Sequence, residues 1–217
     1  MATTIQLTVF FASSALNASG VDGIMPLDLA ERYLTTMTNY FKYKAVAVDI
    51  YPDIKDANAR MVLDQPHQIN TAQHDLSVRQ LAHARYPHGN GRLPVIFAQL
   101  NESSRFPLVK NEDRKRSFLP EILRSEPAMV PLKVCGWVPD EKLITNSWLN
   151  FVMINVNRRS VPELVLAHET GHAAGLDHDE TKEGANNLMY WGDAFSARGL
   201  YDWQMQKIKD AYFTHDV

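Results

Sequence analysis

Three histidines and a glutamate lie within eleven residues, in the stretch "HETGHAAGLDH" at 168–178. His168 and His172 are four residues apart, so on a helix their imidazoles leave the same face, about 6 Å apart. Gly175 lets the chain turn back sharply, and His178 can then reach the same point. Three neutral imidazole ligands with a fourth position left open are typical of a catalytic zinc ion.

Glu169 follows the first of these histidines and is angled to one side of the ligand face. It is poorly placed to bind the metal alongside both helical ligands, but well placed to hold a water molecule on it. Zinc lowers the pKa of bound water towards ~7 and polarises a carbonyl group. Glu169 would accept the proton of the attacking water and return it to the leaving amine, so we expect amide hydrolysis without a covalent enzyme intermediate.

The residues before the histidines predict the helix that carries them. Ser160, followed three residues later by Glu163, forms a capping-box pattern. We therefore expect a helix from about Val161 to about Ala174, with Gly175 as its C-terminal stop.

The rest of the chain alternates between β-rich and helical patterns. Five β-rich segments are expected to form the strands of one mixed, twisted sheet: 4–11, 44–51, 93–100, 131–137 and 148–157. Helical periodicity is found in three further segments, 26–42, 70–86 and 199–213, and one short helix is expected at 118–125. The apolar stripe of the first helix consists of Leu27, Ala30, Leu34, Met37 and Phe41. For the last helix, the expected stripe is Leu200, Trp203, Ile208, Ala211 and Tyr212, and His215 beyond it is expected in a frayed tail.

The composition favours a single globular domain spanning 1–217. With 45% hydrophobic residues the chain can bury one sizeable core, and no Gly/Ser-rich or Pro-rich linker divides it. A formal net charge of −3 gives no reason to expect nucleic acid or an anionic membrane as a partner. The lone Cys135 cannot form an internal disulfide, so the fold does not depend on an oxidising compartment. The N-terminal residues resemble a strand more than a signal peptide, which leaves open the cytoplasm or export by a route without a signal peptide.

The histidine motif resembles the signature of the metzincin metallopeptidases, H-E-x-x-H-x-x-G-x-x-H followed by a Met-turn. The stretch "NLMYW" at 187–191 supplies Met189 as the Met-turn methionine. Gly171 before the second histidine and Leu176 after the motif glycine are similar to matrixins, whereas Asp179 after the third histidine is similar to adamalysins. The resemblance is therefore to a divergent matrixin-like or adamalysin-like branch.

This resemblance implies an α+β, zincin-like fold with the zinc-site helix at the base of a cleft. An upper subdomain of about 1–177 would carry the sheet, and a small lower subdomain of 178–217 would end in a helix. The strand near 131–138 would be the edge strand that binds an extended substrate by β-augmentation.

The resemblance also assigns roles around the metal. Met189 would form an apolar floor beneath the ion without binding it. Tyr190, Trp191 and Phe195 would line the pocket for the side chain after the scissile bond.

The sequence thus predicts a zinc-dependent endopeptidase with one catalytic Zn²⁺, expected to act as a monomer on a peptide or protein substrate. If it is an exported effector protease, an inhibitor or immunity protein would be a further partner. Two alternatives stay open: a zinc-dependent hydrolase of a non-protein amide, and a non-catalytic zinc-containing module that binds peptides. Glu169 argues against the second, because a binding module has no chemical need for a base beside its metal. A second metal site also stays open at His67, His74, His83 and His88.

Overall fold

The computed structural model describes residues 2–11, 15, 26–51, 91–98, 105–106, 130–131, 136–137, 151–155, 164–179, 181, 186–190 and 199–217. The helices expected at 70–86 and 118–125, the four histidines between 67 and 88, and Cys135 lie outside these residues. No helix in the described part of the chain has both the length and the apolar character needed to cross a membrane.

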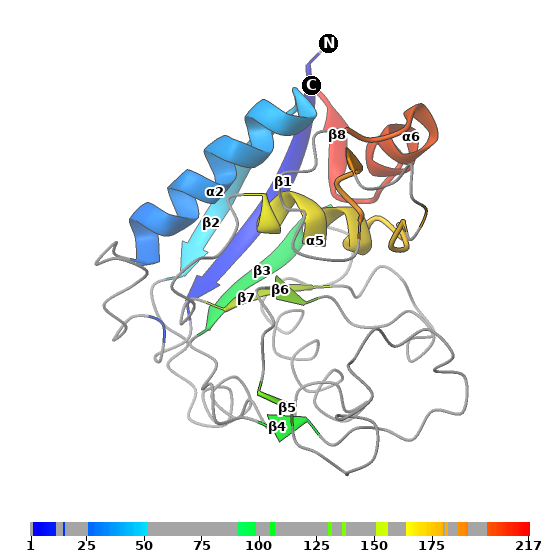
Figure 1. Cartoon of the computed structure of the whole chain (residues 1–217). Helices are drawn as coiled ribbons and strands as arrows, with labels where there is room; N and C mark the ends of the chain where they lie inside the picture. Colours follow the sequence, from blue (N-terminus) through cyan, green and yellow to red (C-terminus); the bar gives the residue numbers. More distant parts are fainter. Residues whose placement is uncertain are drawn as a thin grey trace.

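A mixed sheet lies at the centre of the structure, so the expected mixed α/β architecture is confirmed (Figure 1). Five strands follow one another in the order β2 (Lys44–Tyr51), β1 (Thr3–Phe11), β3 (Leu93–Ala98), β7 (Val152–Asn155) and β6 (Gly136–Trp137). The first four are parallel to one another, and β6 is antiparallel to β7 at the edge.

The strand expected at 131–137 is wrong in its extent. Pro131 belongs to β5 (Val130–Pro131), which pairs with β4 (Arg105–Phe106) in a separate two-stranded sheet. Of the described residues in that segment, Gly136 and Trp137 join the main sheet.

Strand β1 lies inside the sheet, where it pairs with β2 along one edge and with β3 along the other, and residues on both of its faces are buried. Its alternate residues Ile5, Leu7, Val9 and Phe11 belong to the main hydrophobic core. Thr8 and Phe10, on the opposite face, are also buried. A strand buried on both faces is typical of the interior of a parallel sheet.

Helix α2 (Pro26–Phe41) packs on this core largely through the expected stripe, because Ala30, Met37 and Phe41 are buried in it and Leu34 is partly buried against it. Tyr33 and Met37 are buried at its centre, and the Tyr33 ring stacks on Phe97 of β3 at 6.2 Å. Leu27 is 47% exposed, so its expected core position is wrong. The buried face is centred on Tyr33 and Met37, and at 100° per residue Leu27 lies at its margin.

Helix α5 (Val165–Ala173) begins later than the predicted start at Val161. Its N-cap residue, Leu164, makes no side-chain capping hydrogen bond, so the expected capping box does not begin this helix. At the other end the prediction is confirmed, because Gly175 has a φ of 82°. Its N–H donates to His172 O at 2.9 Å, and the Leu176 N–H donates to Gly171 O at 3.0 Å, a Schellman ending.

The C-terminal segment forms a shorter helix than expected and then returns to the sheet. Helix α6 spans Asp202–Lys209, and the last element is strand β8 (Thr214–Asp216), antiparallel to β1. The expectation that the fold ends in a helix, with His215 in a frayed tail, is therefore wrong. Buried Phe213 draws the chain back onto the core, and its carbonyl accepts from the Gln6 N–H at 2.9 Å. Figure 1 shows the two ends of the chain side by side.

The expected apolar stripe of α6 is right only in part. Ile208 is fully buried, but Trp203 is 57% exposed and stacks on Tyr201 at 6.5 Å. The buried positions of the helix are Gln204 and Ile208, four residues apart. Gln204, a polar residue outside the expected stripe, thus lies with Ile208 on the buried face of α6.

Candidate metal centre

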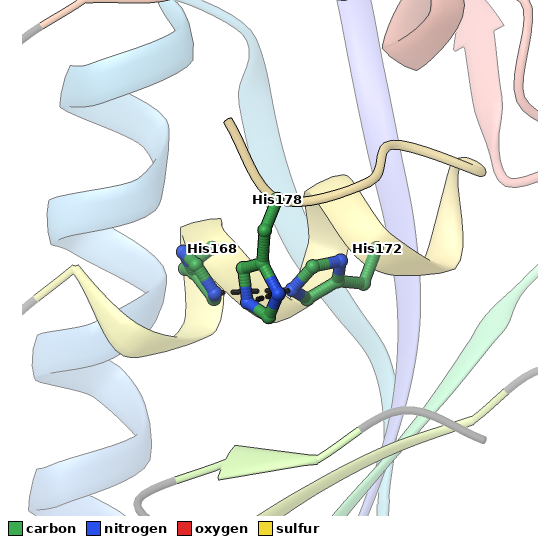
Figure 2. Close-up of side chains that lie close together, drawn as sticks. All are labelled: His168, His172 and His178. Atoms are coloured by element: carbon green, nitrogen blue, oxygen red, sulfur yellow. Dashed lines mark hydrogen bonds between the residues drawn. The ribbon is translucent and has the colours of Figure 1, made fainter. Parts of the chain in front are cut away.

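The structure brings the three predicted histidines together at one point (Figure 2). His168 and His172 project from α5, and His178 comes from the segment that follows Gly175. Nε2 of His172 lies 3.1 Å from Nε2 of His168 and 3.1 Å from Nε2 of His178. One ligand nitrogen from each residue falls within 4.8 Å of the others, so the three side chains could hold a single metal ion.

The second ring nitrogens of the helical ligands are held by backbone carbonyls. His168 Nδ1 lies 2.6 Å from Leu188 O, and His172 Nδ1 lies 2.7 Å from Leu176 O. A carbonyl only accepts, so each Nδ1 carries the proton and each Nε2 keeps its lone pair for the shared point. Such outer contacts orient metal-binding histidines and raise their basicity as ligands.

The surroundings keep these imidazoles neutral. Burial and then the neighbouring His172 lower the pKa of His168 from 6.5 to about 4, against the opposing effect of the Leu188 carbonyl. Burial and then His178 lower the pKa of His172 to about 4. Burial and then His168 lower the pKa of His178 to about 4 as well, although His178 is the most exposed of the three. Neutral imidazoles at pH 7 are ready to bind a cation without first releasing protons.

Glu169 is buried beside the first ligand, with 7% of its surface exposed. Burial raises the pKa of its carboxyl group from 4.5 to about 8. A bound divalent cation would act in the opposite direction, because positive charge favours the carboxylate. The two effects together suit a group that both accepts and returns a proton near neutral pH.

Met189 packs directly against the helix that carries the ligands. It is fully buried, and a Cβ added to Gly171 would lie only 2.5 Å from Met189 Sδ. Gly171 precedes His172 on the helix, so the thioether occupies space that any larger residue there would need. The structure thus places Met189 next to the ligand-bearing turn of α5.

The remaining predicted residues are covered only in part. Tyr190 is half-buried and forms a parallel bridge with Asp179, whose N–H donates to Met189 O at 2.8 Å. Trp191 and Phe195 lie outside the described residues. Strand β6 is at the sheet edge, where the edge strand was expected.

Sequence reasoning missed the polar side chains that α6 contributes next to the site. Lys207 Nζ donates to Gly175 O at 2.8 Å, at the turn that leads to His178. Gln204 contacts Asn187, two residues before Met189. A glutamine and a lysine on an eight-residue helix carry no sequence signal of such contacts.

No protein-family model matches the chain, and no curated protein sequence matches it significantly. The resemblance to metzincins therefore depends on the residues of the motif itself.

Proposed function

We propose that this protein is a zinc-dependent endopeptidase of the metzincin type. The observation that carries the proposal is the convergence of three Nε2 atoms, with Nδ1 of both helical ligands held by carbonyls. Buried Glu169, adjacent to the first ligand, adds the acid–base group that a purely structural site does not require.

Zinc is the metal we propose for this donor set. Three histidines without a fourth protein ligand among the described residues match the ligand count of catalytic zinc sites. Imidazole ligands suit zinc, whereas calcium and magnesium prefer oxygen. When bound, zinc would supply Lewis acidity towards a carbonyl group and towards water.

The residues of the chain would then have two separate roles, metal binding and proton transfer. His168, His172 and His178 hold the ion, and Glu169 takes a proton from the attacking water. Glu169 then delivers that proton to the leaving amine, so no group of the protein becomes covalently attached to the substrate. An extended peptide beside the antiparallel edge strand β6 would present a backbone amide to this site.

Digestion of an unbiased peptide library tests the proposal. The zinc-loaded wild type is compared with Glu169→Gln, which keeps the size of the side chain and removes the base. We expect cuts by the wild type and a loss of rate of at least about 100-fold in the variant. Glu31→Gln, which removes an exposed carboxylate on α2, is the matched control and should cut like the wild type.

Each other outcome points away from a peptidase. Equal cutting by the wild type and Glu169→Gln would show a contaminating protease and reject the role of Glu169. No cutting by a zinc-loaded wild type would favour a non-protein amide as substrate or a peptide-binding role. Recovery of intact peptide bound to the protein would favour the peptide-binding role over hydrolysis of a non-protein amide.

A further inference from the structure

Helix α6 presents one polar side chain to the interior, and its contacts lead to the metal centre. Gln204 is 1% exposed and Ile208 is fully buried, four residues apart on one face. A buried amide must find hydrogen-bond partners to offset the loss of water. The partners of Gln204 are the N-terminal end of its own helix and Asn187, which is itself 4% exposed.

The hydrogen bonds fix both amides in a single orientation. The Met189 N–H donates to Asn187 Oδ1 at 2.9 Å, so Asn187 turns its Nδ2 towards Gln204 and donates to Oε1 at 2.8 Å. The Tyr201 N–H donates to the same Oε1 at 2.9 Å. Backbone N–H groups can only donate, so neither amide can flip without losing a bond.

The turn held in this way carries the carbonyl that contacts a metal ligand. Leu188 lies between Asn187 and Met189, and its oxygen is 2.6 Å from Nδ1 of His168. A displacement of this short turn would move the Leu188 carbonyl and with it the preferred orientation of the His168 ring. Outer partners of this kind change metal affinity when they are removed, although they never touch the ion.

We propose that Asn187 and Gln204 are positioning residues of the metal centre, which set the His168 ring through the Leu188 carbonyl. The inference rests on the proposed zinc site. It concerns the retention and ligand field of the metal, so it can be tested without any substrate.

The test compares zinc release from purified, zinc-loaded variants into an excess of chelator. Gln204→Met keeps the side-chain length but has no oxygen acceptor for Asn187 or Tyr201. We expect zinc to leave this variant about tenfold faster than the wild type, with a changed visible spectrum after substitution with Co²⁺. Gln204→Glu keeps oxygen acceptors for both donors and should restore release to within about twofold of the wild type.

A loosened helix could also speed release, and Ile208→Val controls for it. This variant removes packing from the same face of α6 without touching the two amides. Release as fast from Ile208→Val as from Gln204→Met would overturn the positioning role. An unchanged release rate and cobalt spectrum in folded Gln204→Met would overturn it as well.

A second variant keeps the proposal testable if Gln204→Met does not fold. Asn187→Asp still accepts from the Met189 N–H, but it places an oxygen opposite Gln204 Oε1 where the Nδ2 donor was. We expect the same acceleration of zinc release, and an unchanged rate would contradict the proposal. Failure of the wild type to retain zinc would instead reject the proposed metal site. This outcome can be told apart from a failure of the positioning role, which shows only in the variants.

Discussion

The two ring nitrogens of His168 have different partners, and that difference governs how the site responds to acid. Nδ1 is bound to the Leu188 carbonyl, while Nε2 lies 3.1 Å from Nε2 of His172 and is available to either a proton or a metal ion. Burial lowers the pKa of both His168 and His172 from 6.5 to about 4. In the metal-free protein these two histidines therefore bind fewer protons in the folded state than in the unfolded state between these values, and their contribution to the free energy of unfolding falls as the pH drops through that window.

The same shift predicts the pH at which the proposed zinc ion would be released. Protons compete with the metal for Nε2, and in the folded protein they do so only near the lowered pKa of about 4. We expect zinc to stay bound down to about pH 5 and to be released as the pH approaches about 4. Equilibrium dialysis with metal analysis across this range measures the release.

A peptide covering residues 168–178 is the control for this measurement. Its histidines are exposed to water and have ordinary pKa values near 6.5, so it should lose zinc at a higher pH than the folded protein. A protein that releases zinc at the same pH as the peptide would show that burial does not protect the ligands.

Helix α5, which carries His168 and His172, packs against the side chain of Met189 at Gly171. Substitution of a helical glycine by alanine normally stabilises a protein by up to about 1 kcal/mol. Here the added Cβ would lie 2.5 Å from Met189 Sδ and 3.2 Å from its Cε. Met189 is fully buried and cannot move away freely, so we expect Gly171→Ala to lower the free energy of unfolding by about 1–3 kcal/mol.

Urea unfolding of the metal-free protein measures this effect without a contribution from zinc. The double variant Gly171→Ala with Met189→Ala provides the control, because a shorter side chain at 189 leaves room for the new methyl group. The cost of Gly171→Ala should largely disappear in the Met189→Ala background. An increase in stability for Gly171→Ala alone would mean that helix propensity outweighs the contact.

Local sequence patterns predicted those elements whose structure is decided locally. The four-residue spacing of His168 and His172 and the positive φ of Gly175 follow from helix geometry and glycine chemistry, so both were predictable. The start of α5 at Val165 was not, because the capping pattern at 160–163 does not begin that helix. Tyr33 and Trp203 show the same limit: the face that a helix buries depends on the neighbours it packs against.

At the level of the whole chain, the contacts that the sequence conceals are those between its two ends. Strand β8 pairs with Thr3–Ile5 of β1, and β3 pairs with the following residues of β1, from Leu7 to Phe11. No local pattern in the last residues predicts a partner more than 200 residues away. The next element after α6, which carries Gln204 with its contact to Asn187, is therefore a strand paired into the central sheet.

Deletion of residues 215–217 should therefore destabilise the whole fold. The deletion removes paired backbone bonds of 2.9 Å between Ala2 and Val217, the Thr3 Oγ1 bond to Asp216 and the His215 Nε2 contact with Gly91 O at 2.8 Å. At about 1 kcal/mol for each hydrogen bond, we expect the free energy of unfolding to fall by about 2–4 kcal/mol in denaturant titration.

Val217→Ser is the matched control, since it keeps the backbone bonds and changes only a side chain that is 75% exposed. A deletion variant as stable as Val217→Ser would mean that these residues fray in solution, as their sequence alone suggested. A destabilised deletion variant would mean that the pairing of β8 with β1 contributes to the stability of the fold.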